Sequence, residues 1–364
     1  MQTEKAALVG IVIKGNDPWA TDDSLDELAL LADTAGGEVI DRFVQSRQRP
    51  DPSTFVGSGK VAEIASNNGQ FDLVIFDDDL SPAQAAKLEK LIGKRVIDRS
   101  GLILDIFARR ARTREARTQV ELAQLQYLLP RLTGHWQHLE RQKGGIGLRG
   151  PGETQLETDR RLVNKRISRL KADLKQIEKQ RNTQRQGRQQ YFKAALVGYT
   201  NAGKSTLMNA LTHAGVFVED RLFATLDATV RSLRYGDGDP MMLIDTVGFI
   251  RKLPHHLVAS FRSTLEETVM ADLLVHVVDL SHPHFPSQMQ QVKETLESLG
   301  LKDHPQLLVF NKADKVEFPA EIKRIQAEYP NAEFISALRG IRIDALRERL
   351  RLEQTKWQHA CKPH

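Results

Sequence analysis

The sequence predicts an α/β protein in three parts. We expect an N-terminal α/β domain over residues 1–108, an antiparallel helical hairpin over 109–190 and a second α/β domain over 191–350, with a short tail at 351–364. In the first and last parts, short apolar runs alternate with helical patterns, which is typical of parallel sheets covered by helices. The middle part instead shows two long helical repeats and an excess of positive charge.

Length and composition narrow the class of protein. The 364 residues are 40% hydrophobic, enough for two or three domains with ordinary cores. A single cysteine, Cys361, excludes an intramolecular disulfide and a cysteine metal site, so we expect a reducing, cytoplasmic location. No run approaches the roughly 18 apolar residues that cross a bilayer. We therefore expect no transmembrane segment and a soluble protein, which we take to be monomeric.

Positive charge is concentrated in the middle of the chain. Residues 109–193 hold 21 Lys and Arg against 8 Asp and Glu, whereas the net charge of the whole chain is only +5. A basic segment between two acidic parts is typical of a surface that binds a polyanion. Contact with nucleic acid or the ribosome is the favoured interpretation, and a solvated helix face is the alternative.

The N-terminal part alternates strands and helices. We expect strands at 8–13, 38–43, 72–76 and 96–98, and helices at 22–35 and 81–92. Ser81 followed by Pro82 fits a helix cap with proline in the first position. Gly57, Ser58, Gly59 and Lys60 look like a phosphate-binding loop, but only one residue separates the glycines. We interpret them as the start of a helix, with a second nucleotide site as the alternative.

Two apolar seams predict the helical hairpin. The first has Leu125, Leu128, Leu132, Trp136 and Leu139, and the second has Val163, Ile167, Leu170, Leu174 and Ile177, at steps of three and four. Pro130 should kink the first helix.

A glycine-rich break at 144–153 separates the two seams. It is either a passive linker or a tip that becomes ordered on a partner. Arg141, Lys143 and Arg149 near the tip favour RNA as that partner. The returning helix extends the basic face with Arg160, Arg161, Lys165, Arg166, Arg169 and Lys171.

The segment 198–206 fits the phosphate-loop pattern G-x-x-x-x-G-K-[ST], between a strand-like run and a helical one. Its glycines allow a tight turn whose backbone N–H groups bind phosphates at a helix N-terminus. Lys204 would reach the outer phosphates, and Ser205 would bind magnesium. The nucleotide-binding candidates are Gly198, Tyr199, Thr200, Asn201, Ala202, Gly203, Lys204, Ser205 and Thr206.

A polar loop and a second motif would bind the metal and the terminal phosphate. In the polar loop at 221–229, Thr225 and Thr229 both have the chemistry to bind magnesium. The D-x-x-G pattern of Asp245, Thr246, Val247 and Gly248 follows a strand. Asp245 would hold the metal through water, and the Gly248 N–H would sense the third phosphate.

The last two motifs indicate guanine. Asn311, Lys312, Ala313 and Asp314 form N-K-x-D after a strand. The Asp314 carboxylate accepts hydrogen bonds that guanine supplies and adenine cannot. Lys312 would lie over the base, and Asn311 would brace the phosphate loop. Backbone N–H groups at Ser336, Ala337 and Leu338 would meet the guanine oxygen. Four motifs in the right order predict a C-terminal P-loop GTPase domain.

Nearly the whole chain resembles the HflX type of P-loop GTPase. The resemblance rests on F-V-G-S-G-K at 55–60, D-R-S at 98–100, G-G-I-G-L-R-G-P-G-E at 144–153 and F-A-T-L-D at 223–227. It implies that Thr225, rather than Thr229, is the magnesium-binding threonine. It also adds Phe223, Ala224, Leu226 and Asp227 to the nucleotide site. The family binds the large ribosomal subunit and its RNA, and is credited with splitting or rescuing ribosomes. Its members often carry a further C-terminal domain, whereas 25 residues follow Arg339 here.

The expected reaction is hydrolysis of GTP to GDP and phosphate with Mg2+ as cofactor. Lys204, Thr225 and Gly248 would be the catalytic residues, and Ser205 and Thr225 the metal ligands. Many relatives place a glutamine after D-x-x-G, but this chain has Phe249, which cannot orient water. We therefore expect slow hydrolysis that the ribosome accelerates.

Two other functions remain open at this point. One is a metabolic kinase, which would use the same phosphate loop but has no need of Asn311 and Asp314. The other is an RNA-binding protein with a regulatory, weakly hydrolytic guanine-nucleotide site.

Overall fold

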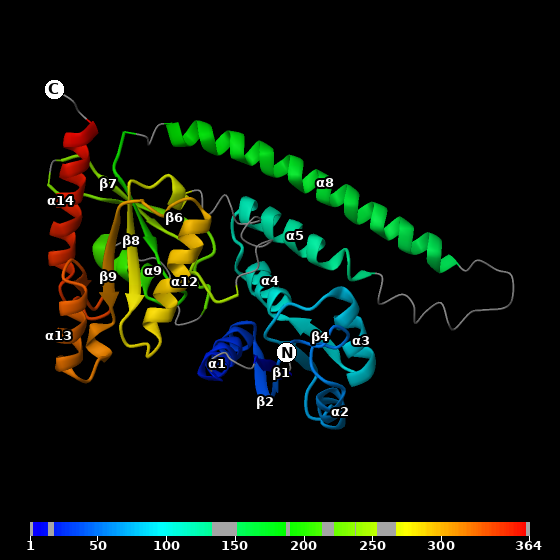
Figure 1. Ribbon diagram of the computed structural model, residues 1–364. Coiled ribbons are helices and arrows are strands. Elements are labelled where there is room, and N and C mark those ends of the chain that lie inside the picture. Colours follow the sequence, from blue (N-terminus) through cyan, green and yellow to red (C-terminus); the bar gives the residue numbers. More distant parts are fainter. Residues whose placement is uncertain are drawn as a thin grey trace, which may run out of the picture. The chain divides into compact units, whose positions relative to one another are not determined.

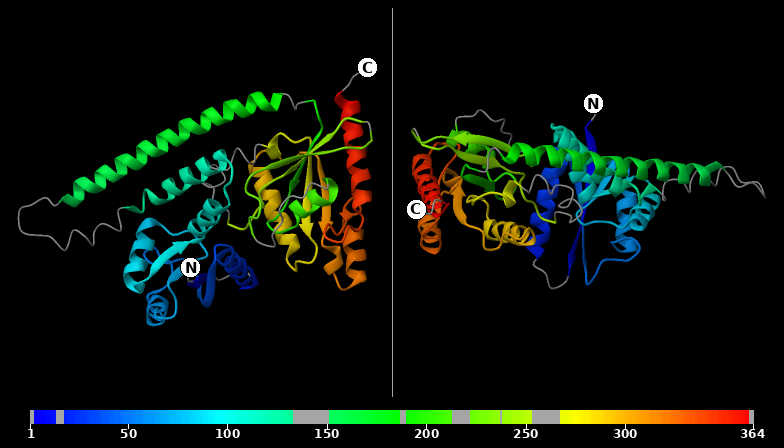
Figure 2. Two further views of the ribbon diagram at one scale, coloured as in Figure 1. Left: turned by 180° about the vertical axis from the view of Figure 1, so that it is seen from behind. Right: turned by 90° about the horizontal axis from the view of Figure 1, so that it is seen from above.

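The computed structural model describes residues 3–13, 18–132, 151–186, 190–212, 222–236, 238–252 and 267–361. It divides into two compact units, and neither is continuous in sequence (Figures 1 and 2). The first comprises Met1–Arg109 and Arg117–Gln176, and the second comprises Arg110–Ala116 and Ile177–His364. Residues of the predicted hairpin therefore occur in both units.

A four-stranded parallel sheet forms the centre of the first unit, as the alternating pattern predicts. The strand order is β2 (Gly37–Arg47), β1 (Glu4–Ile13), β3 (Leu73–Phe76) and β4 (Arg95–Asp98). All four residues of β3 are buried, which explains its unbroken apolar sequence.

The helices of this unit include α1 (Pro18–Thr34), α2 (Ser58–Ser66), α3 (Pro82–Ile92) and α4 (Arg99–Arg110). Ser81 caps α3 by accepting a hydrogen bond from the Gln84 N–H, and Pro82 follows it, as predicted. Gly57 is the N-cap residue of α2. The G-S-G-K segment is therefore the start of a helix, which confirms that interpretation.

The two apolar seams meet between α5 (Arg114–Leu128) and α8 (Pro151–Gln186). Leu122, Ile167 and Leu170 are buried together, and partly buried leucines extend the contact. The first helix is shorter than expected, because residues 111–113 are not helical and α5 ends at Leu128.

The helical path is interrupted at Pro130: residues 129–131 form a turn, residue 132 is helical again, and the rest of the expected first helix lies outside the described residues. Proline lacks a backbone N–H and disfavours helical geometry in the preceding residue, and here it lies in a turn just beyond the end of α5. Trp136, Leu139 and the tip residues Arg141, Lys143 and Arg149 lie outside the described residues, as does the glycine-rich segment up to 150.

The second unit contains a six-stranded sheet in the order β10-β9-β8-β5-β7-β6. Only β6 runs antiparallel to its neighbour among these strands. The strands are β5 (Lys193–Val197), β6 (Thr229–Leu233), β7 (Met241–Asp245), β8 (Leu273–Asp279), β9 (Gln306–Asn311) and β10 (Glu333–Phe334). After β5 the chain builds β6 and β7 on one side of that strand and then returns to build β8, β9 and β10 on its other side. The loop after β5 therefore lies at the switch point where such folds bind ligands.

Helices cover both faces of this sheet (Figure 1). They are α9 (Lys204–Thr212), α12 (Phe285–Ser298), α13 (Pro319–Glu328) and α14 (Ile343–Cys361), with a 3-10 turn η1 (Ala313–Lys315) after β9. Leu307 and Val309 pack in the core shared with α9 and α14, whereas the neighbouring Phe310 packs in the core shared with α12 and α13. This alternation along β9 follows from the two faces of a strand.

Candidate functional site

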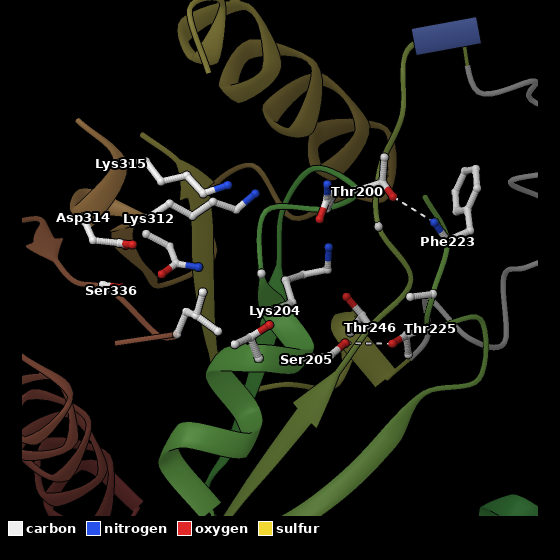
Figure 3. A pocket seen from close by; sticks show the side chains of 17 residues that line it. Thr200, Lys204, Ser205, Phe223, Thr225, Thr246, Lys312, Asp314, Lys315 and Ser336 are labelled. Carbon is white, nitrogen blue, oxygen red and sulfur yellow. Dashed lines mark hydrogen bonds between the residues drawn. The ribbon is translucent and has the colours of Figure 1, made fainter. Parts of the chain in front are cut away.

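One pocket in the second unit collects side chains from all four predicted motifs (Figure 3). Its volume is about 230 Å3, and it opens where β5, β7 and β9 end. The predicted residues that line it are Thr200, Asn201, Gly203, Lys204, Ser205, Thr206, Phe223, Ala224, Thr225, Thr246, Gly248, Asn311, Lys312, Asp314, Ser336 and Leu338. Loops that follow separate strands thus come together at one edge of the sheet.

Other predicted residues lie outside this lining. They are Gly198, Tyr199, Ala202, Leu226, Asp227, Asp245, Val247, Ala313 and Ala337. Gly198 and Tyr199 supply carbonyl oxygens behind the pocket wall. Leu226 is 2% exposed and packs inward, and the Tyr199 hydroxyl accepts a hydrogen bond from the Arg251 N–H.

The phosphate loop requires glycine at two positions. At Gly198, with φ of 150°, a Cβ atom would lie 2.2 Å from the Val277 carbonyl oxygen. At Gly203, with φ of 89°, it would lie 2.3 Å from Asn311 Nδ2. Both distances are far below van der Waals contact, so any side chain there would open the loop.

Lys204 is folded back onto the loop that precedes it. Its Nζ donates hydrogen bonds to the carbonyl oxygens of Gly198 (3.1 Å) and Tyr199 (2.9 Å). Burial lowers the pKa of Lys204 to about 8, although the nearby Asp245 carboxylate favours the charged form. The site thus holds a partly desolvated cation that an anionic ligand would stabilise.

Three oxygen-bearing side chains converge beside Lys204. Ser205 Oγ donates to Asp245 Oδ2 at 2.6 Å and lies 2.8 Å from Thr225 Oγ1. Thr225 Oγ1 donates to the same carboxylate oxygen at 3.3 Å. The other oxygen, Asp245 Oδ1, is buried and has no hydrogen-bond partner among the described residues. Burial raises the pKa of Asp245, against the lowering effect of Ser205 and Lys204.

This donor set suits a magnesium ion. Mg2+ prefers hydroxyl, carboxylate and water oxygens, all of which the cluster of Ser205, Thr225 and Asp245 can supply or hold. A buried carboxylate oxygen without a partner is costly, and a cation or its water shell would satisfy it. The residues present therefore fit the metal that the sequence motifs imply.

Thr225 and Thr229 differ in position. Thr225 lines the pocket, whereas Thr229 begins β6 and pairs with Asp245 in the sheet. The loop before Thr225 is fixed at Phe223, which has φ of 54° and donates its N–H to Thr200 Oγ1 at 3.0 Å. The geometry thus favours Thr225 as the oxygen donor of this loop.

Asp227 points to a different part of the chain. Its Oδ2 accepts hydrogen bonds from the backbone N–H groups of Arg112 (3.1 Å) and Thr113 (3.3 Å), and its Oδ1 accepts one from the Thr113 hydroxyl. In the expected nucleotide site it therefore supplies no lining side chain. Sequence spacing could not have shown this contact, because its partners are more than a hundred residues away.

The far end of the pocket is organised around Asn311. Its Nδ2 donates to the Ala202 carbonyl (2.9 Å), and its Oδ1 accepts from the Ala337 N–H (2.9 Å), so it joins the phosphate loop to the segment at 336–338. Lys312 forms an ion pair with Asp279 at 2.7 Å. Asp314 lines the pocket, with the Arg339 guanidinium 4.0 Å away.

Lys315 also lines the pocket, although none of the sequence motifs includes it (Figure 3). It lies three residues after Lys312 and ends the 3-10 turn η1. Such a turn has three residues per turn, which places side chains at i and i+3 on one side. A lysine at this spacing after N-K-x-D was the available signal.

Phe249 is held in the wall behind the phosphate loop. Its N–H donates to the Gly198 carbonyl (3.1 Å), its carbonyl accepts from the Thr200 N–H (2.7 Å), and it is 2% exposed. A buried benzyl group has no atom that can orient water, so the residue after D-x-x-G makes no polar contribution to the pocket.

Among the described residues, no group of three or more His, Cys, Asp and Glu side chains could hold a metal ion. Within the same part of the chain, no helix is both long and apolar enough to span a membrane. His276 is buried beside Lys204, and burial lowers its pKa to about 4, so its imidazole is neutral near pH 7.

Known protein families match most of the chain. Three protein-family models match in succession: the GTP-binding GTPase N-terminal model over 22–108, the GTP-binding GTPase Middle Region over 110–188, and the 50S ribosome-binding GTPase over 193–312.

Curated relatives match most of the chain. GTPase HflX from Escherichia coli strain K12 is 51% identical over 359 residues, which are 95% of this chain and 83% of that protein. GTPase HflX from Flavobacterium psychrophilum is 54% identical over 314 residues, which are 85% and 76% of the two chains. Among solved structures, the SsGBP and GDP complex aligns with a TM-score of 0.53 and 25% identity, covering 98% of this chain and 99% of that chain.

Proposed function

This chain belongs to the HflX family of GTPases, and we propose that it hydrolyses GTP while bound to the large ribosomal subunit. The reaction would serve the splitting, rescue or biogenesis of ribosomes. The observation that carries the nucleotide part is the Asn311 bridge, which fixes the phosphate loop to the segment at 336–338 across one pocket. The observation that supports the ribosomal part is the basic helical region at 109–190.

Within the pocket, we assign the phosphates to Lys204 and to the backbone N–H groups of residues 198–206. These donors would stabilise negative charge on the transferred phosphoryl group. Gly248 would contact the third phosphate through its N–H. A Cβ on Gly248 would lie 2.6 Å from Thr200 Cα, so this close approach to the phosphate loop requires glycine.

We assign Mg2+ to Ser205 and Thr225, with Asp245 acting through water. A bound Mg2+ would neutralise charge on the outer phosphates. The protein's part is to hold the two hydroxyl groups in place, which the carboxylate of Asp245 does by accepting hydrogen bonds from both.

Guanine would lie between Lys312 and the segment at 336–338. Asp314 would accept hydrogen bonds from the ring N–H and the exocyclic amine. The ion pair with Asp279 holds Lys312 at the pocket wall, where its methylene groups could cover one face of the base.

We expect slow hydrolysis in the absence of a partner. The residue after D-x-x-G is Phe249, whose buried side chain has no polar atom to orient the attacking water. The ribosome would accelerate turnover by ordering the loops around the third phosphate or by adding polar groups to the pocket.

We assign RNA contact to the outward face of α8. Arg161, Lys165 and Arg169 are exposed and four residues apart, so they share one face with a rise of about 6 Å per step. This face lies opposite Ile167 and Leu170, which pack against α5. Arg166 is different, because it forms a two-pronged ion pair with Glu121 at 2.6 and 2.8 Å. Exposed cations at this spacing would contact phosphates without reading sequence.

The decisive experiment is cosedimentation with isolated ribosomal subunits in the presence of GTP, GDP or a non-hydrolysable GTP analogue. We expect binding to the large subunit that is stronger with the analogue than with GDP, together with GTPase stimulation. The triple variant R161E/K165E/R169E should lose binding, whereas its pocket-based GDP affinity should be unchanged.

A control tests whether exchanging charged side chains on α8, with no change in net charge, is enough to abolish binding. The double exchange R166E/E121R keeps the net charge and can re-form the ion pair, so it should retain binding. Equal sedimentation of wild type and the triple variant would contradict the assignment of RNA contact to this face. Equal turnover with and without ribosomes would contradict the proposed stimulation.

A further inference from the structure

The start of α5 contacts the loop that carries Thr225. Residues Arg110–Ala116 belong to the same compact unit as the pocket, although they lie far from it in sequence. Asp227, two residues after Thr225, accepts three hydrogen bonds from Arg112 and Thr113. This contact ties the loop to the helix start, and the reactions assigned above make no use of it.

Thr113 serves two groups at once. Its hydroxyl donates to Asp227 Oδ1 and accepts from the Ala116 N–H at 3.1 Å, which is the hydrogen bond of a helix N-cap. The carboxylate of Asp227 also lies at the N-terminal end of α5, where a negative charge is favoured. Hydrogen bonds to a charged group are stronger than neutral ones, and three of them meet on this one carboxylate, although all three are exposed to solvent.

The attachment restricts Thr225 because the intervening chain is short. Two residues span at most about 7 Å. Leu226 between them is 2% exposed, and on the other side Phe223 is fixed to Thr200. Thr225 is therefore held from both sides, by the phosphate loop through Phe223 and by the helix start through Asp227.

The helix start is itself fixed within this unit. Arg181, near the end of α8, forms ion pairs with Glu115 of α5 at 2.8 Å and with Glu267 at 3.0 Å. All three side chains are largely buried. The segment of Arg112 and Thr113, which binds Asp227, is thus held in place by the ion pairs of the adjoining helix α5.

We propose that Thr113 is a positioning residue for GTP hydrolysis, which holds Asp227 and thereby keeps Thr225 at the oxygen cluster of Ser205 and Asp245. Loss of this support lets Thr225 move away from the position of the metal and the third phosphate. The effect falls on turnover rather than on GDP binding, because Thr225 is expected to be needed only in the triphosphate state. The inference rests on the GTP hydrolysis proposed above.

The test measures kcat and KM for GTP, and the Kd for GDP, with no ribosomes present. Thr113→Val removes the hydroxyl at nearly constant size, and Asp227→Asn removes the charge while leaving the cap of α5 intact. Each should lower kcat about tenfold, which corresponds to one hydrogen bond to a charged group. KM and the GDP Kd should stay within about twofold. Thr113→Ser, which keeps the hydroxyl, should restore the rate.

A double-mutant cycle separates positioning from general damage. In a Thr225→Ala background, Thr113→Val should cause little further loss, because it acts through a group that is already absent. Ser81→Ala removes a comparable N-cap from α3 and should leave kcat unchanged. Melting temperatures show that each variant is folded.

Three results would overturn the proposal: an unchanged kcat in Thr113→Val, a full additional loss in the Thr225→Ala background, or an equal loss in Ser81→Ala. Because these rates are measured without ribosomes, failure of ribosome stimulation would overturn the proposed function and leave this inference standing. If ribosomes stimulate turnover but Thr113→Val leaves kcat unchanged, this inference fails and the proposed function stands.

Discussion

The side-chain amide of Asn311 donates a hydrogen bond to the carbonyl oxygen of Ala202 at a distance of 2.9 Å. The same side chain accepts one from the Ala337 N–H, so a single buried residue connects the phosphate end of the pocket to the base end. Each end is held in position by the other, which makes this residue a sensitive point for binding and for stability.

Asn311→Ala should weaken both GTP and GDP binding by about tenfold or more and lower the free energy of unfolding by about 2 kcal/mol, because it leaves buried groups unpaired. Asn311→Asp keeps the acceptor for Ala337 but loses the donor to Ala202, and should also weaken binding. Fluorescent-GDP titration and chemical denaturation measure the two effects. Exposed Asn331→Ala is the control, and wild-type affinity in Asn311→Ala would contradict the bridging role.

Asp314→Asn should change the preferred base from guanine to xanthine. The amide can donate to the xanthine oxygen, but it no longer accepts both guanine donors, so GTP affinity should fall by about 30-fold or more. Competition between GTP and XTP for the pocket measures the change. Exposed Asp303→Asn should keep the guanine preference, and an unaltered preference in Asp314→Asn would argue against the base assignment.

Nucleotide affinity should depend on pH through Lys204. Burial lowers the pKa of this ammonium group to about 8 in the empty pocket, and bound phosphates would favour its charged form. The free protein loses this charge as pH rises through about 8, so binding above that pH requires uptake of a proton. GDP affinity should be flat below about pH 7 and should fall by up to about tenfold per pH unit well above pH 8.

Calorimetry in buffers of different ionisation enthalpy measures this uptake directly. About half a proton should be taken up at pH 8, where the free lysine is half charged. Constant affinity up to pH 9.5 with no proton uptake would show that Lys204 stays charged in the empty pocket.

Phe249→Gln should not accelerate intrinsic hydrolysis. The backbone of Phe249 is paired with the phosphate loop on both sides, and its side chain is directed into the buried wall. A glutamine there would bury an amide without partners, at a cost of about 2–3 kcal/mol in folding stability. Single-turnover hydrolysis and thermal melting test this, with Phe249→Leu as the apolar control. A rate increase would mean that the side chain can turn toward the third phosphate.

The sequence predicts the pocket well because its motifs follow strands. Asp245 ends β7 and Asn311 ends β9, and parallel strands place their carboxyl ends at one edge, so short patterns suffice to bring these loops together. Contacts between distant segments are different. The pairing of Asp227 with Thr113 and of Lys312 with Asp279 depends on tertiary packing, which no spacing encodes.

The apolar periodicity also did not predict where the helices begin and end. The apolar seam continues past Leu128, but it cannot show that α5 ends there and that a turn follows, in which the Arg131 N–H donates to the Leu128 carbonyl. Similarly, the sequence does not show why residues 111–113 are not helical. The hydroxyl of Thr113, which caps α5, also donates a hydrogen bond to Asp227, more than a hundred residues later. A periodic pattern reports which face is buried and leaves the boundaries to local hydrogen bonding.

The second unit takes in seven residues, Arg110–Ala116, from ahead of its main segment, and this affects how the protein can be divided. A truncated fragment that starts near residue 190 would contain every nucleotide motif and yet lack the partners of Asp227. Such a fragment would lack contacts that hold the loop of Thr225, so its kinetic constants should not be transferred to the intact chain.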